Sequence, residues 1–251
     1  MFREMATLCV RSLRGPGCYS GDITVFTNNN FRAVDRRVQT IAMPNEMSTQ
    51  VIRQFKARAH LFIEHRRYDA IMSMDADMLA VRDIRPLLGY RVNRACGMKE
   101  KPWTRMSDRS CRTCLTKAEQ MTARHRWGVN GGLLCTPGHL FQEYMELWDR
   151  EIARRRGALR TWINQPPLNA LILRRKINFT AYPEGWITMP QMYQIRGRRD
   201  GGHKNARILH FCCPSKTLGI IEMELAFAKQ TNRAGRSQGA VLWRGGTRRR
   251  S

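Results

Sequence analysis

The sequence predicts an α/β fold, and three observations point to it. Segments with helical spacing of apolar residues alternate with short runs typical of β-strands along most of the chain. A mostly apolar run over residues 68–79 is expected to form a central strand with two carboxylates at its far end. The 251 residues are 42% hydrophobic, which is enough for one sizeable domain with a packed core.

The N-terminal part is expected to run helix, turn, strand, strand, helix. Four apolar residues lie on one helical face: Met5, Leu8, Cys9 and Leu13. Gly15-Pro16-Gly17 should end that helix, and strands over 22–27 and 38–43 should precede a helix over about 48–64. A nucleotide-binding α/β sheet normally opens with a strand before its first helix. That strand is missing here, so we expect an N-terminal truncation or a start at an internal methionine.

The rest of the chain is expected to continue the alternation. Residues 81–88 should form a turn and one helical turn, 97–126 a loop or lid, and 127–135 a strand broken by glycines. Helices are expected over 140–157, from 164 with prolines in its first turn, and over 217–230. Residues 179–190 are β-like, and residues 208–216 should form a short strand that runs into a loop. We therefore expect one domain over 1–216, then a C-terminal helix and a basic flexible tail over 217–251.

The composition limits the partners and the compartment. The net charge of +24 and the pI near 10.9 favour polyanionic partners, although arginines spread along the whole chain are typical of a solvated face. No run of 18 apolar residues and no basic-then-apolar leader occurs, which predicts a cytoplasmic protein, possibly peripheral at an anionic membrane. Eight scattered cysteines predict free thiols, and a lone Cys111-x-x-Cys114 is a weak zinc signal.

Asp75 and Asp77 are the strongest chemical signal. Side chains in an extended chain alternate between two faces, so these carboxylates should point the same way, with Ala76 leaving room for a ligand. Carboxylate oxygens suit Mg²⁺ or Mn²⁺, which commonly keep positions open for substrate phosphates. The pair therefore predicts a divalent cation site that serves a phosphate-bearing substrate.

Four segments, taken in order along the chain, carry motifs that resemble those of one known enzyme family. The residues from Lys56 to Leu61 resemble the family's Y-A-R-L-K helix, and those from Met74 to Leu79 resemble its D-x-D block. Residues 129–134 are similar to its F-N-A-G-V-L-L strand, and residues 210–216 to its H-Y-x-G-x-x-K motif. Together these motifs resemble those of the retaining glycosyltransferases of family 8, which include the glycogenins and the bacterial lipooligosaccharide galactosyltransferases. The similarity covers about residues 5–216.

The resemblance implies a GT-A fold, in which a Rossmann-like mixed sheet joins an acceptor-binding half. It implies that Mn²⁺, or Mg²⁺, is held by three residues: Asp75, Asp77 and His210. The same ion would hold the diphosphate of a nucleotide-sugar donor, expected to be a UDP-sugar. Donor contacts are implied for Arg58, Asn130 and Lys216.

The expected reaction is transfer of a hexose to an unknown glycan, lipid-linked sugar or protein. The family's D-Q-D-x-L-N segment lies beside the anomeric carbon and is similar to residues 164–169, which makes Gln165 and Asn130 the candidate catalytic residues. Both acidic positions are altered, to Asn164 and Pro166, and Cys213 stands where the family has glycine. Since no carboxylate stands in place of a nucleophile, the hypothesis is a front-face reaction with retention of anomeric configuration.

Three other functions also fit parts of the sequence. A catalytically inactive glycosyltransferase relative would explain Asn164 and Pro166. A phosphatase of the haloacid dehalogenase type also has a D-x-D after an apolar strand, but it needs threonine at the position of Leu79. A nucleic-acid-binding domain would fit the positive charge, yet no recognition helix, zinc finger or RNA-binding aromatic motif occurs in the sequence.

Overall fold

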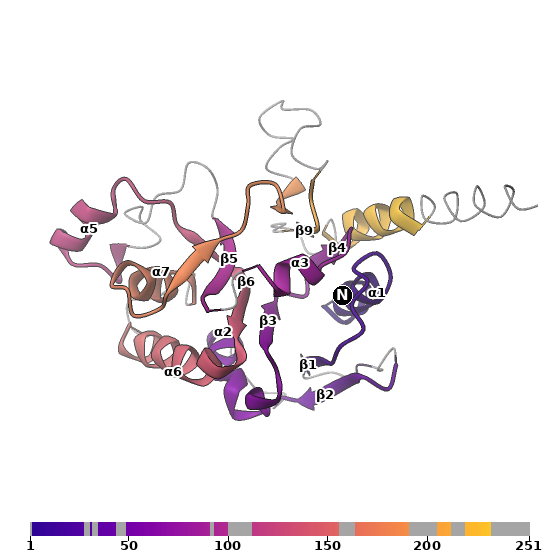
Figure 1. Cartoon of the computed structure of the whole chain (residues 1–251), viewed down its shortest axis with the longest axis horizontal. Coiled ribbons are helices and arrows are strands. Elements are labelled where there is room, and N and C mark those ends of the chain that lie inside the picture. Colours follow the sequence, from indigo (N-terminus) through magenta and orange to yellow (C-terminus); the bar gives the residue numbers. More distant parts are fainter. Residues whose placement is uncertain are drawn as a thin grey trace, which may run out of the picture.

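The structure is a computed structural model that describes residues 2–27, 31, 35–43, 49–90, 93–99, 112–155, 164–190, 205–211 and 219–231. It confirms the predicted α/β class (Figure 1). The strands are β1 (Ile23–Thr27), β2 (Val38–Ala42), β3 (Ala70–Met74), β4 (Met78–Ala80), β5 (Ala95–Lys99), β6 (Val129–Pro137), β7 (Phe179–Ala181), β8 (Ile187–Thr188) and β9 (Ile208–His210).

The helices separate these strands along the chain. They are α1 (Phe2–Arg14), α2 (Thr49–Arg58), α3 (Arg85–Leu88), α5 (Lys117–Ala123), α6 (Gly138–Arg155) and α7 (Gln165–Leu173), with 3₁₀ turns η1 (Ala59–Leu61) and η2 (His65–Arg67). Residues 219–231 are also helical, as expected for the C-terminal helix. The predicted basic tail from 232 onward lies outside the described residues.

The described strands form three hydrogen-bonded sheets. In the largest, β3, β6, β5 and β7 lie in that order, with β6 antiparallel to both β3 and β5. All nine residues of β6 are buried, which makes it the central strand of the molecule. A second sheet joins β4, β9 and β8, and a third consists of β1 parallel to β2. Because β4 follows β3 after a short turn, the first two sheets meet at residues 75–77.

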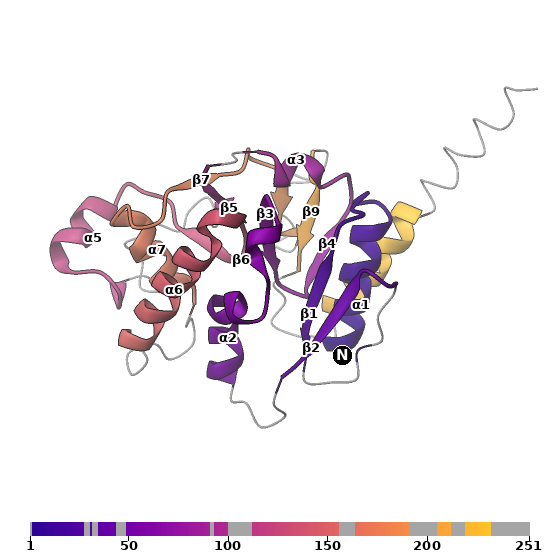
Figure 2. The same ribbon diagram turned by 60° about the horizontal axis from the view of Figure 1, so that its bottom comes forward.

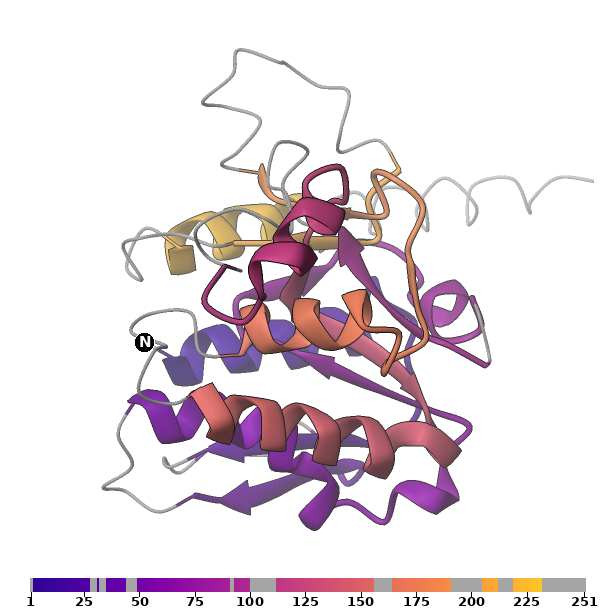
Figure 3. The same ribbon diagram turned by 90° about the vertical axis from the view of Figure 1, so that its left-hand side faces the viewer.

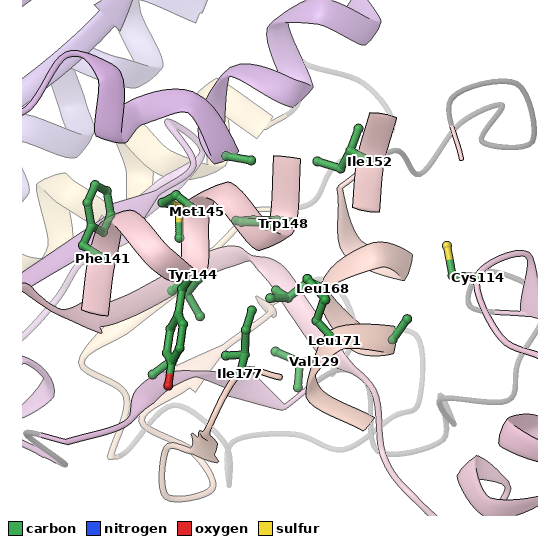
Figure 4. Packing of buried hydrophobic residues seen from close by; sticks show 14 of the residues in the cluster. Cys114, Val129, Phe141, Tyr144, Met145, Trp148, Ile152, Leu168, Leu171 and Ile177 are labelled. Atoms are coloured by element: carbon green, nitrogen blue, oxygen red, sulfur yellow. The ribbon is translucent and has the colours of Figure 1, made fainter. Parts of the chain in front are cut away.

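One core lies between β6 and the helices α6 and α7. The predicted inward stripe of α6 is confirmed, since its members are all buried: Phe141, Tyr144, Met145, Trp148 and Ile152. Leu168 and Leu171 of α7 pack in the same cluster (Figure 4). Figure 3 shows α6 and α7 side by side. This packing fixes α7 against β6, beside the candidate site.

A second region of core lies under α1. Cys9 and Leu13 of α1 pack with residues of β4 and β6, while Met5 packs with Leu79, as the helical spacing predicts. Met223 in the helix over 219–231 joins the Met5 cluster, and Figure 2 shows this helix beside α1. The C-terminal helix therefore packs on the α/β body.

Three expectations about local structure were wrong. The carboxylates do not lie on the strand: β3 ends at Met74, and residues 75–77 form the connection to β4. The helix expected to reach residue 64 ends at Arg58, where η1 begins and the ring of Phe62 stacks on Phe55. The expected loop over 97–126 contains the end of β5 and the helix α5, which Thr116 starts with a capping box.

Two further expectations concern thiols and membranes. Cys114 is a buried free thiol, whereas Cys111 lies outside the described residues, so the lone C-x-x-C is not tested as a metal site. None of the helices in the described part of the chain combines the length and the apolar composition that crossing a bilayer would require.

Candidate metal centre

Strand pairing brings the three predicted metal ligands together. The β4–β9 ladder places Met78 opposite His210, so Asp77 lies one residue from the histidine's partner. The Phe211 N–H donates a 2.8 Å hydrogen bond to the carbonyl oxygen of Asp77, and the Asp75 N–H donates one of 2.8 Å to the carbonyl oxygen of Gly132. Backbone hydrogen bonds thus hold each carboxylate at the junction of the two sheets.

The distances among these side chains suit one divalent cation. A ligand atom from each of Asp75, Asp77 and His210 lies within 4.8 Å of the others. His210 Nε2 and Asp77 Oδ1 are 3.3 Å apart, and the side chains of these two residues are 2% and 12% exposed. Ligands of one ion are separated by at most roughly 4–5 Å at bond lengths of about 2.0–2.6 Å. Two carboxylates with one imidazole fit Mn²⁺ better than Mg²⁺, because imidazole is the softer donor.

Lys56 is a site residue that the sequence did not identify as one. Its ammonium forms an ion pair with Asp75 Oδ1 and donates a 2.9 Å hydrogen bond to the carbonyl oxygen of Gly131. The lysine side chain is 14% exposed, and the Asp75 side chain 41%. Lys56 was part of the segment that resembles the family's helix, but no periodicity or spacing set it apart from the other basic residues.

Gly132 lies at the centre of this group. A methyl group on its Cα would come within 2.6 Å of His210 Cε1, 2.7 Å of Asn130 Oδ1 and 2.9 Å of Asp75 Oδ2. The two oxygens of the Asp75 carboxylate therefore have different neighbours: Oδ1 pairs with Lys56, while Oδ2 lies beside Gly132. The close approach explains why this strand carries glycine here.

The amide side chains of β6 and α7 form the next layer of the site. Asn130 Oδ1 accepts a 2.7 Å hydrogen bond from the Gly132 N–H, and Gln165 Oε1 accepts one of 3.2 Å from the Gly131 N–H. Both amides are nearly buried, at 5% and 6% exposure. Asn169 accepts from the Val129 N–H and donates to its carbonyl oxygen, at 2.7 and 3.0 Å. These bonds fix the start of α7 on β6.

Arg58 and Lys216 complete the list of predicted residues. Arg58 Nε lies 3.1 Å from Asp149 of α6, and Gln54 Nε2 donates a 2.6 Å hydrogen bond to the same carboxylate. The arginine therefore joins α2 to α6, and it is Lys56, one half-turn earlier, that pairs with Asp75. Lys216 and Cys213 lie outside the described residues.

Cys9 of α1 lies behind the carboxylates. Burial, followed by the negative charges of Asp77 and Asp75, raises the pKa of its thiol to about 12. Cys9 is thus a neutral, buried side chain of the core, in the cluster through which α1 packs against β4.

Comparison with known proteins adds evidence on the fold. No protein-family model matches the chain, and no curated protein matches it. Many solved structures are similar in fold, and two of them are forms of one enzyme. The galactosyltransferase LgtC, in complex with donor and acceptor sugar analogues, has a TM-score of 0.61 at 12% identity, over 91% of this chain and 92% of that one. An active-site glutamine-to-glutamate mutant of LgtC has a TM-score of 0.63 at 11% identity, over the same shares. This likeness confirms that the chain has the GT-A glycosyltransferase fold that the sequence predicts.

Proposed function

We propose that this chain is a metal-dependent glycosyltransferase that moves a hexose from a UDP-sugar to an acceptor, with retention of anomeric configuration. The observation that carries the proposal is the cluster of Asp75, Asp77 and His210 at the sheet junction of a GT-A fold. A similar fold in LgtC holds donor and acceptor sugar analogues. The acceptor of this chain would be a glycan, a lipid-linked sugar or a protein.

Asp75, Asp77 and His210 would hold Mn²⁺, which supplies positive charge to the departing diphosphate when it is bound. Lys56 would add a second positive charge at the same place, because its ammonium already reaches Asp75. Charge that is fixed before the reaction stabilises the leaving group without any rearrangement. We propose the same role for Lys216.

Gln165 and Asn130 would orient the donor sugar. The backbone N–H groups of Gly131 and Gly132 donate to their amide oxygens and hold both side chains beside the candidate metal centre, where they would contact the donor sugar. A glutamine is also an active-site residue in LgtC, according to the mutant described above. Arg58 would contact the donor only after it releases Asp149.

A second candidate is a nucleotide-sugar-binding protein that does not transfer the sugar. It is supported by the altered acidic positions and by the structural use of the amides: Asn169 docks α7 on Val129, and Gln165 holds Gly131. Such a protein would keep the metal centre and the donor site, yet it would not transfer the sugar to an acceptor.

The two candidates are separated by incubating the protein with a panel of UDP-hexoses and Mn²⁺, then recording UDP release and the NMR spectrum of the sugar product. The proposed transferase gives metal-dependent release with retained configuration, and Asp77→Asn abolishes it. Mn²⁺-dependent binding of the UDP-sugar without turnover supports the second candidate. Release that continues in Asp77→Asn, or an inverted product, contradicts the proposal.

A further inference from the structure

A pocket lies at the end of the largest sheet that is opposite to the candidate metal centre. Its volume is about 880 Å³, within the range of about 300–1,000 Å³ that small-molecule sites occupy. Three neighbouring strands contribute lining residues: Ala70 at the start of β3, Cys135 and Pro137 at the end of β6, and Cys96 of β5. The pocket therefore lies on a face of this sheet and not at its edge.

The pocket is separate from the edge of β3 that does not pair with β6. None of the lining residues that the structure describes belongs to α1, β1 or β2, and the lining instead continues across β6 to β5 and to α3. Asp75 follows Ala70 by five residues, roughly 16–17 Å of extended chain. The pocket is thus distinct from the candidate metal centre, and an inference about it does not rest on the proposed function.

The base of the pocket is aliphatic. Leu87, Cys96 and Cys135 are buried, while Ala70 and Leu88 are half-buried and pack against the same cluster. Both cysteines are free thiols, which behave as small apolar side chains when buried. These five side chains include no aromatic ring to stack on a nucleobase and no amide or hydroxyl group to bind a sugar. The base therefore suits a hydrocarbon chain.

The rim of the pocket is basic. It carries Arg66 and Arg67 of η2, Arg94 before β5 and His139 of α6, against one acidic residue, Asp69. α6 begins beside this rim without an acidic residue in its first turn, so the positive end of its dipole adds to the charge of the arginines. The rim therefore favours a negatively charged group.

Two of the rim arginines are available to a ligand. Arg67 pairs with Glu64 at 3.1 Å, but no carboxylate among the described residues pairs with Arg66 or Arg94. Arg94 Nη1 makes a long contact of 3.4 Å with the hydroxyl of Thr180. Both Arg66 and Arg94 are exposed. Guanidinium groups form charge-assisted, often bidentate hydrogen bonds with phosphate and carboxylate oxygens.

We propose that this pocket binds an aliphatic chain that ends in a phosphate or carboxylate group. The chain lies on Ala70 and Leu88 at the base, and the head group binds Arg66 and Arg94 at the rim. Removal of the chain from water drives binding, and the guanidinium groups select a negatively charged head group. A neutral molecule with the same chain lacks the second contribution, and inorganic phosphate lacks the first.

NMR of a protein with ¹³C-labelled alanine and leucine methyl groups locates the ligand, and isothermal titration calorimetry measures its affinity. The probes are decyl phosphate and decanoate, each below its critical micelle concentration, with decanol and inorganic phosphate as controls. Nuclear Overhauser effects should connect the chain of the probe to the methyl groups of Ala70 and Leu88. At least one charged probe should bind at least tenfold more tightly than both controls, and the tighter of the two probes identifies the head group.

Matched variants separate this pocket from the general positive charge of the protein, which is +24. Arg66→Gln/Arg94→Gln should weaken binding of the charged probe at least tenfold, because it removes the two available rim charges. Arg11→Gln/Arg82→Gln removes the same charge from exposed positions outside the pocket and should leave the affinity within about twofold of the parent.

A third variant fills the base of the pocket. Ala70→Leu places added carbon atoms where the chain lies, so it should weaken binding at least tenfold, and thermal unfolding shows whether the variant is folded. If it does not fold, the two arginine variants decide the question. Equal affinity for decanol, equal weakening in Arg11→Gln/Arg82→Gln, or Overhauser effects to the exposed Leu61 or Leu225 in place of the base would overturn the proposal. No metal or nucleotide-sugar enters these measurements, so the pocket and the proposed function can fail independently.

Discussion

Gly132 is the residue at which one added methyl group should disable the candidate metal centre. In Gly132→Ala, the new Cβ would lie 2.6 Å from His210 Cε1, 2.7 Å from Asn130 Oδ1 and 2.9 Å from Asp75 Oδ2. Each distance is at least about 0.5 Å inside the ordinary contact range, which begins at 3.4 Å. His210 and Asn130 are 2% and 5% exposed, so neither can move away into solvent.

The size of the effect follows from these overlaps. Metal bonds tolerate displacements of only about 0.2 Å, less than the methyl group requires of two ligands. We expect the affinity for Mn²⁺ to fall by at least tenfold, about 1.4 kcal/mol. Overpacking at a buried position should also lower the free energy of unfolding by about 1–3 kcal/mol.

Gly131→Ala is the matched control for this variant. Its Cβ would meet only ordinary contacts, at 3.6 Å from the Cα and Cβ of Gln165, so metal affinity should stay within about twofold of the parent. Isothermal titration calorimetry with Mn²⁺ and urea unfolding measure both quantities. If Gly132→Ala binds Mn²⁺ as the parent does, the arrangement of His210 and Asp75 around Gly132 is not the metal centre.

Three other substitutions test separate parts of the account. Lys56→Met should tighten Mn²⁺ binding at least tenfold, because the ammonium beside Asp75 repels the ion, and it should weaken UDP-sugar binding. Calorimetry that shows weaker Mn²⁺ binding in this variant would contradict the expectation. Asn169→Leu should cost about 2–4 kcal/mol in urea unfolding, since two buried main-chain groups of β6 lose their partner, and a loss under 1 kcal/mol contradicts it. The hydrogen bond from Arg174 lowers the pKa of Glu119 from 4.5 to about 2, so its stabilisation is present above pH 4.5 and lost as the pH falls toward 2. The free energy of unfolding of Glu119→Gln should therefore be about 1 kcal/mol lower than that of the parent at pH 7, after solvent screening. This difference should shrink as the pH falls from 4.5 toward 2, and a difference that stays constant over that range would contradict the expectation.

Local patterns explain what could be predicted from the sequence. The apolar stripes of α1 and α6 repeat at helical spacing, and the structure buries that of α6 and all of that of α1 except Leu8, which is partly buried. The three residues of the candidate metal centre could also be named from the sequence, two as carboxylates one residue apart and one as the histidine of a resembling motif, and the structure brings them together. Their meeting depends on the β4–β9 ladder, which joins segments about 130 residues apart and which residue patterns alone do not specify.

The parts that could not be predicted depend on contacts between distant residues. Arg58 matches a donor-binding motif, but its partner Asp149 lies on another helix, 91 residues away. Lys56 of the same helix pairs with Asp75, and this pairing depends on the orientation of α2 about its own axis relative to the sheet.

Pulsed EPR of bound Mn²⁺ probes the candidate metal centre itself, because it detects ligand nitrogen without any need for a substrate. If Asp75, Asp77 and His210 hold the ion, the parent protein should bind one Mn²⁺ whose electron spin couples to a single imidazole nitrogen, that of His210. The coupling should disappear in His210→Gln, while Asp77→Asn should bind the ion at least tenfold more weakly. Bound Mn²⁺ without nitrogen coupling, or a coupling that survives in His210→Gln, would contradict the proposed site.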